Sequence, residues 1–165
     1  MKMLFHYNWK VREEWYAWCE GVSEEELLKK RTGGVGSILE TLFHNIDVEW
    51  SWIRVLKGEE DFKENFEGYR SLDKVRELDA RFKPEVEEFV ANWDSSMEDR
   101  VLVSTGKDGT EYTDPWGEVM RHIIAHEIHH IGQLSVWSRE LDREPVSADL
   151  LGRGLADSTR TGENN

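Results

Sequence analysis

Residues 122–134 read HIIAHEIHHIGQL and hold four of the six histidines of the chain. An α-helix turns by about 100° per residue, so the four histidines fall within one sector of about 100°. His126 and His130 lie inside the apolar stripe of the same helix, whereas His122 and His129 lie at its edge. The other members of this stripe are Trp116, Val119, Ile123, Leu134, Trp137 and Leu141. The pattern predicts a helix that turns two imidazoles, one turn apart, toward the core of a helical protein.

Two imidazoles one turn apart on a buried face can bind a divalent metal ion, and unpaired polar groups tolerate burial badly. A third ligand must come from another helix, and outside the cluster the chain offers only His6 and His44. His44 lies centrally on the inward stripe that we predict for residues 37–57, and His6 is a weaker alternative. We therefore predict a metal site formed by His44, His126 and His130, with water completing the coordination. Three protein ligands and one open position are typical of a catalytic site.

Hydrophobic periodicity predicts four long helices, over about residues 3–20, 37–57, 72–93 and 115–141. A short helix should follow Ser23, and the alternating segment RVLVSTGKDGTEYT at residues 100–113 predicts a small β-hairpin. The predicted fold class is all-α, a four-helix bundle with this hairpin before the last long helix. We expect the bundle to comprise residues 1–150 and the polar residues 151–165 to form a disordered C-terminal tail.

Several residues predict where these helices begin, end or bend. Helix starts are indicated by three capping patterns, namely Ser23 with Glu26, Ser37 with Glu40, and Asp114 as N-cap before Pro115 as first helical residue. Gly58 should close the second long helix, and Pro84 should bend or interrupt the third. The inward stripe of the second long helix is predicted to contain Thr41, His44, Val48, Ser51, Trp52 and Val55.

Charge and composition exclude some classes of protein. The chain has 165 residues, with 34 Asp and Glu against 21 Lys and Arg, and a formal net charge of -13. Such a surface would repel a phosphate backbone, so we expect no nucleic acid partner. No signal peptide and no run of 18 apolar residues is recognisable, so we expect no membrane segment. Cys19 is the single cysteine and cannot form an internal disulfide, which fits a reducing cytoplasm.

The residues HEIHH at 126–130 also match the zinc-protease pattern HExxH, in which Glu127 would be the general base. The extension of that pattern is missing, because Gln133 and Val136 stand where a metzincin has Gly and His. No glutamate occupies the place of a more distant ligand either. On the helical wheel Glu127 points away from the metal face. The sequence therefore argues against a peptidase.

Two segments carry a resemblance to a known family. HNIDVEWSWI at residues 44–53 and HEIHHIGQL at residues 126–134 resemble the DinB/YfiT-like superfamily, whose pattern is a His on the second helix and HxxxHxGQ on the fourth. The segments YNWKVREEWYAWCEGVSEEEL and GSILETLFHNID also look like family openings, so the resemblance covers about residues 3–150. By position, the metal ligands of the family fall on His44, His126 and His130. Ile131 departs from the pattern, since many members have Arg there.

The resemblance implies a four-helix bundle, often dimeric, with a divalent metal such as zinc or nickel. Related proteins include thiol S-transferases that use bacillithiol or mycothiol, and proteins described as metal-dependent hydrolases. Our leading hypothesis is a metal-dependent thiol S-transferase that joins a low-molecular-weight thiol such as bacillithiol to small electrophiles. The alternatives are a hydrolase that uses a metal-bound water and a non-catalytic metal- or ligand-binding bundle. We expect a cytoplasmic homodimer with a small-molecule substrate.

Further residues are predicted to lie close to the metal site or to line a pocket beside it, namely His122, His129, Gln133, Trp52, Trp116 and Trp137. Gln133 follows His129 by one turn and could hydrogen-bond a ligand or a bound water. The tryptophans would form an apolar wall, although core packing is the simpler explanation for each. We expect Cys19 to be a buried small residue rather than a nucleophile.

Overall fold

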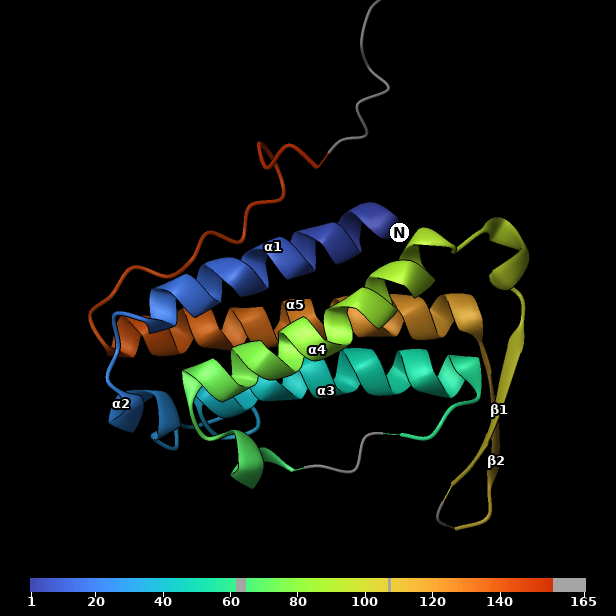
Figure 1. Ribbon diagram of the computed structural model, residues 1–165, viewed down its shortest axis with the longest axis horizontal. Coiled ribbons are helices and arrows are strands. Elements are labelled where there is room, and N and C mark those ends of the chain that lie inside the picture. Colours follow the sequence, from blue (N-terminus) through green and yellow to red (C-terminus); the bar gives the residue numbers. More distant parts are fainter. Residues whose placement is uncertain (62–64, 107, 156–165) are drawn as a thin grey trace, which may run out of the picture.

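The computed structural model describes residues 1–61, 65–106 and 108–155 and is mostly helical, with one small antiparallel sheet. Four long helices lie side by side (Figure 1); they are α1 (Lys2–Cys19), α3 (Ile38–Lys57), α4 (Leu72–Ala91) and α5 (Trp116–Glu140). Both α1 and α3 pack against α4 and α5. The shorter helical elements are α2 (Glu24–Leu28) and the 3-10 helices η1 (Phe66–Tyr69) and η2 (Ser95–Met97). The predicted helical character of the chain is thus confirmed.

The predicted hairpin is also confirmed, and it extends two residues further than expected. Strand β1 (Val101–Thr105) pairs antiparallel with β2 (Glu111–Pro115), and Val101 lies opposite Pro115. In Figure 1 the hairpin projects from one end of the long helices, where it joins α4 and η2 to α5. Because β2 includes Pro115, the chain is still extended at the residue that we predicted to be helical.

Capping groups set the helix starts largely as predicted. The Ser23 hydroxyl accepts a hydrogen bond from the backbone N–H of Glu26 (3.3 Å), and Ser37 accepts one from Glu40 (3.1 Å). Gly58 ends α3 with a φ of 71°, a left-handed conformation that glycine adopts without steric cost. These bonds satisfy backbone groups that would otherwise lack partners at the helix ends.

One prediction about helix geometry is wrong, and of the two effects predicted for Pro84, a bend or an interruption, the interruption is excluded. Pro115, rather than Asp114, is the N-cap of α5, and no side chain caps this end, because Asp114 belongs to the paired strand β2. Pro84 does not interrupt α4, which continues as a helix from Leu72 to Ala91. A proline removes one backbone hydrogen bond, and the buried apolar face of α4 compensates for this loss.

The inward stripe predicted for the second long helix is wrong in most of its members. Only Thr41 of that set is buried, whereas His44, Val48, Ser51, Trp52 and Val55 are half-buried. The residues of α3 that face the core are instead Leu42, Ile46, Glu49, Ile53 and Leu56, together with Ile38, Leu39, Phe43, Asn45 and Trp50. Because α3 packs against both α4 and α5, it buries a broad face. His44 therefore lies at the border of this face rather than at its centre.

The hydrophobic core lies between the four long helices. Phe5 and Trp15 of α1, Ile53 of α3, Val75 of α4 and Leu134 of α5 are all 0 % exposed. Burial of side chains of this size contributes roughly 1.5–3 kcal/mol each, so every long helix is anchored by its apolar face. Within the described ranges, no helix has both the length and the apolarity to span a bilayer.

The segment after α5 returns along α1. Arg153 pairs with Glu14 at 2.7 Å, and Lys10 donates to the backbone carbonyl of Arg153 at 2.9 Å. The tail predicted for residues 151–165 therefore begins with residues that contact α1. Residues 156–165 lie outside the described part of the chain.

We predict that Cys19 does not react in the folded protein. Its side chain is 0 % exposed, and burial raises the pKa of its thiol to about 12, even though Arg143 acts in the opposite direction. Only the thiolate attacks a disulfide reagent, so at pH 8 labelling should be at least ~100-fold slower in folded than in unfolded protein. The rate of absorbance change with an aromatic disulfide would measure this. A folded protein that reacts as fast as a free thiol would contradict the prediction.

Candidate metal centre

Three histidine side chains from two helices converge at one point. The Nε2 atom of His126 lies 3.1 Å from Nε2 of His44 and 3.2 Å from Nε2 of His130. All three ligand atoms lie within 4.8 Å of one another. Two nitrogens bound to one tetrahedral zinc at 2.0–2.1 Å stand about 3.3 Å apart, so the spacings of His126 to His44 and to His130 fit a shared divalent ion.

The fold explains why these three residues meet. His126 and His130 lie one turn apart on α5, so both rings project from the same side of that helix. His44 lies on α3, which packs against α5, at the half-buried border described above. The structure therefore brings together the three residues that the sequence had suggested as ligands. His6 lies on α1 beside Trp9, with ring centroids 5.2 Å apart, and is not part of this group.

A side-chain amide orients one of the rings. Oε1 of Gln133 lies 2.7 Å from Nδ1 of His130, and Nε2 of Gln133 lies 3.0 Å from Nε2 of His129. A carbonyl oxygen accepts the Nδ1 proton of His130, which leaves the Nε2 lone pair free to face the other two rings. Gln133 thus connects the exposed His129 to the buried His130.

The surroundings keep the three imidazoles neutral. Burial, together with the neighbouring His130, lowers the pKa of His44 to about 4, and burial and the surrounding histidines lower the pKa of His126 to about 4. Burial also lowers the pKa of His130, although Gln133 opposes this shift. Neutral imidazole is the form that binds a metal. The group is therefore ready to act as a ligand set at neutral pH.

The metal-free protein should lose stability as the pH falls from about 6.5 to about 4. In this range the unfolded chain binds protons at His44 and His126 while the folded chain does not, because their folded pKa values are about 4. The unfolding midpoint should therefore fall with pH, and His44→Phe should flatten this part of the profile. Circular dichroism at several pH values would measure it, with His6→Phe as the control at an exposed histidine. Equal slopes for all three proteins would contradict the expectation.

The other predicted site residues are placed in different ways. His122 and His129 are exposed, with ring centroids 5.9 Å from His126 and 5.2 Å from His130, respectively. Among the described residues neither belongs to the group that could hold one ion. The cluster therefore offers three protein ligands rather than a closed set of four.

The tryptophans do not act as one wall. Trp52 is half-buried, and its ring lies 5.8 Å from that of His122. Trp116 lies instead against Phe89. Trp137 is buried and donates to the backbone carbonyl of Thr32 at 3.2 Å. Of the three, Trp52 is the one with a ring contact to a histidine of α5.

A hollow of about 300 Å³ lies beside His122, and none of the three clustered histidines lines it. It is lined by Trp52, Asp114, Glu118, Val119 and His122, and so begins one turn before His126 on α5. A cavity of this size can accept a small organic molecule. A larger hollow of about 540 Å³ lies between α1 and α4, but none of the histidines lines it. We assign the smaller hollow to the candidate site because His122, which lines it, has its ring 5.9 Å from that of His126.

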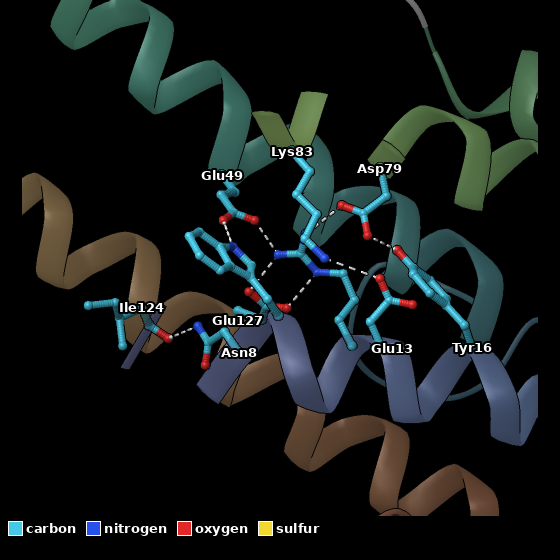
Figure 2. Close-up of polar contacts among 10 residues, drawn as sticks. Asn8, Glu13, Tyr16, Glu49, Asp79, Lys83, Ile124 and Glu127 are labelled. Carbon is cyan, nitrogen blue, oxygen red and sulfur yellow. Dashed lines mark hydrogen bonds and ion pairs between the residues drawn. The ribbon is translucent and has the colours of Figure 1, made fainter. Parts of the chain in front are cut away.

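A buried charge network, which the sequence analysis missed, lies next to this centre. It consists of Arg12, Glu49, Asp79 and Glu127, all 2–5 % exposed. Arg12 of α1 pairs with Glu49 of α3, Asp79 of α4 and Glu127 of α5 (Figure 2). Tyr16 donates its hydroxyl to Asp79 at 2.9 Å. One guanidinium therefore connects all four long helices.

The charged groups in this network shift one another's pKa values. Burial disfavours the charge of Arg12, but the three carboxylates more than offset this and raise its pKa. Burial raises the pKa of Glu49, although Arg12 opposes the shift. A hint was present in the sequence, since Arg12 stands at helical spacing between the apolar residues Phe5 and Cys19. Such a position predicts a buried charge that needs partners.

Glu127 does not face the histidine cluster. Both of its carboxylate oxygens accept hydrogen bonds from Arg12, at 2.8 and 2.7 Å. Figure 2 shows Glu127 turned toward Glu49 and the network. This arrangement agrees with the helical wheel and with the argument against a zinc peptidase.

The comparisons with known proteins agree with these features. The model of the DinB family matches residues 1–160 of the chain. The uncharacterized protein YizA of Bacillus subtilis strain 168 is 48% identical over 155 residues, which cover 94% of this chain and 96% of the relative. The similarity therefore extends over all the helices and both histidine segments.

Proposed function

The chain belongs to the DinB family, and from this premise we propose that it is a metal-dependent thiol S-transferase that acts on small electrophiles. His44, His126 and His130 would hold a divalent ion, with zinc or nickel as the first candidates. The observation that carries the proposal is the convergence of three neutral Nε2 atoms from α3 and α5. When bound, the ion would supply Lewis acidity that lowers the pKa of a thiol.

The residues around the cluster have separate roles in this proposal. Gln133 holds the ring of His130 by its Nδ1 atom and so keeps Nε2 directed at the ligand position. Trp52 and Val119 give the adjoining hollow an apolar side that would receive the electrophile and exclude water. In the reaction, the thiol loses its proton to solvent, its sulfur bonds to the electrophilic carbon, and the leaving group departs with its electron pair.

Metal-dependent hydrolysis is the second candidate, and the three-ligand cluster is the observation that favours it. Three protein ligands leave a position for water as readily as for a thiol. A fourth protein ligand would favour a non-catalytic metal-binding protein, but among the described residues the cluster has three ligands. The remaining expectations, a four-helix bundle of the DinB/YfiT-like type, a homodimer and a cytoplasmic location, belong to the same proposal.

Two measurements test the proposed function. Protein purified without chelator or affinity metal should contain about one metal ion per chain by elemental analysis. With that metal, conjugation of cysteine or bacillithiol to a model alkyl halide should be at least ~10-fold faster than with metal-stripped protein. Equal rates with and without metal would refute thiol transfer. Metal-dependent turnover of an ester without any thiol would instead support the hydrolase.

A further inference from the structure

The buried charge network touches both helices that carry the histidines. Glu127 is the residue after His126 on α5, and Glu49 lies on α3 together with His44. Arg12 of α1 hydrogen-bonds both carboxylates. One side chain on a helix without any ligand therefore connects the two helices that supply the ligands.

The hydrogen bonds that Arg12 donates have well-defined directions. Its Nε and Nη2 atoms donate to the two oxygens of Glu127, which is a bidentate pair, and Nη2 also pairs with Glu49. A guanidinium is planar, so these bonds fix the orientation of the two carboxylates as well as their distance. The side chain of Arg12 is 3% exposed, so bulk water does not compete for these bonds.

The rotation of α3 and α5 about their own axes matters for the cluster. Ring nitrogens of helical histidines lie about 6 Å from the helix axis, so a rotation of 10° moves them by about 1 Å. Metal–ligand distances tolerate only about 0.2 Å. Glu49 and Glu127 project from the sides of α3 and α5 that face Arg12, and holding them restrains the rotation of each helix.

We propose that Arg12 is a positioning residue for the three-histidine centre and sets the relative rotation of α3 and α5 through Glu49 and Glu127. This inference rests on the proposed metal site, but not on the identity of the reaction. Arg12 does not touch the cluster and acts only through the two carboxylates. Its contact with α4, made by Asp79, which also accepts a hydrogen bond from Tyr16 of α1, supplies no ligand and provides an internal control.

The test measures metal binding rather than activity. It compares variants of the Arg12 contacts with α3 and α5 to a variant on the α4 side of the network. Arg12→Lys keeps the positive charge but loses the planar fork. We expect it to lower the affinity for Co²⁺ by about 10- to 100-fold, the range for groups that orient a ligand, and to change the visible spectrum of bound Co²⁺. Glu49→Gln, which weakens only the contact with α3, should shift both quantities in the same direction.

Tyr16→Phe is the matched control, because it removes a buried hydrogen bond of the same network on the α4 side. It should leave Co²⁺ affinity and spectrum as in the wild type even if the unfolding midpoint falls. The inference is overturned if Tyr16→Phe weakens metal binding as much as Arg12→Lys, since the effect would then be one of general stability. Wild-type affinity and spectrum in folded Arg12→Lys would also overturn it; if that variant does not fold, Glu49→Gln decides. Wild-type protein that binds Co²⁺ but transfers no thiol would refute only the proposed function.

Discussion

His126→Ala is expected to abolish metal binding and thiol transfer together. His126 is the central member of the cluster, because its Nε2 atom is the one within 3.1 Å of His44 and 3.2 Å of His130. Removal of this ring leaves His44 and His130 as the two remaining ligands of the group. Loss of a direct ligand should exceed the ~10- to 100-fold loss in affinity that is typical of groups orienting a ligand. We therefore expect a loss of more than ~100-fold.

Elemental analysis and a competition titration with a chromogenic chelator would measure this effect. His122→Ala is the matched control, since His122 lies one turn earlier on α5 and is outside the ligand group. It should retain about one metal ion per chain. A His126→Ala protein that still holds one ion per chain would show that the metal is bound elsewhere and would remove the basis for the proposed function.

Glu127→Ala is expected to lower stability by about 3 kcal/mol. Glu127 is 2% exposed and accepts two hydrogen bonds from Arg12. Breaking a buried ion pair usually costs about 3–5 kcal/mol. We expect the lower end of this range, because Glu49 and Asp79 still neutralise the charge of Arg12.

Urea unfolding of the metal-free proteins would measure this difference. Glu140→Ala is the control on the same helix, since the Glu140 side chain is 50% exposed and its partner Arg31 keeps a second pair with Glu26, so this contact should contribute at most about 1 kcal/mol. The experiment also tests whether Glu127 is the general base that the HExxH pattern would require. A general base could be removed with little change in stability, so a Glu127→Ala protein as stable as the wild type would contradict the role that the structure gives to this residue.

Helix α5 contributes residues both to the candidate centre and to the charge network. One side of the helix carries His126 and His130, and another carries Glu127, which Arg12 holds. The same division occurs on α3 with His44 and Glu49. The structure therefore separates the neutral histidine ligands from the buried charged residues, although the members of the two sets alternate along the chain.

Local sequence was sufficient for the elements and for part of the centre. Capping at Ser23 and Ser37, the hairpin, and the spacing of His126 and His130 were all predictable, because each depends on residues within a few positions of one another. The predicted start of α5 was wrong, because Asp114 pairs within the hairpin. This pairing overrides the local capping signal of the residue.

Contacts between distant helices were decided only by the tertiary structure. Periodicity gives the face of a helix to within tens of degrees, and this is too coarse to show that α3 turns Glu49 to Arg12 and His44 to its border. The sequence determined by itself that two histidines on α5 would share one side. Whether His44 would complete the set, and which carboxylates would surround Arg12, depended on how four helices pack, because helix rotation and spacing are fixed by the combined fit of all their side chains.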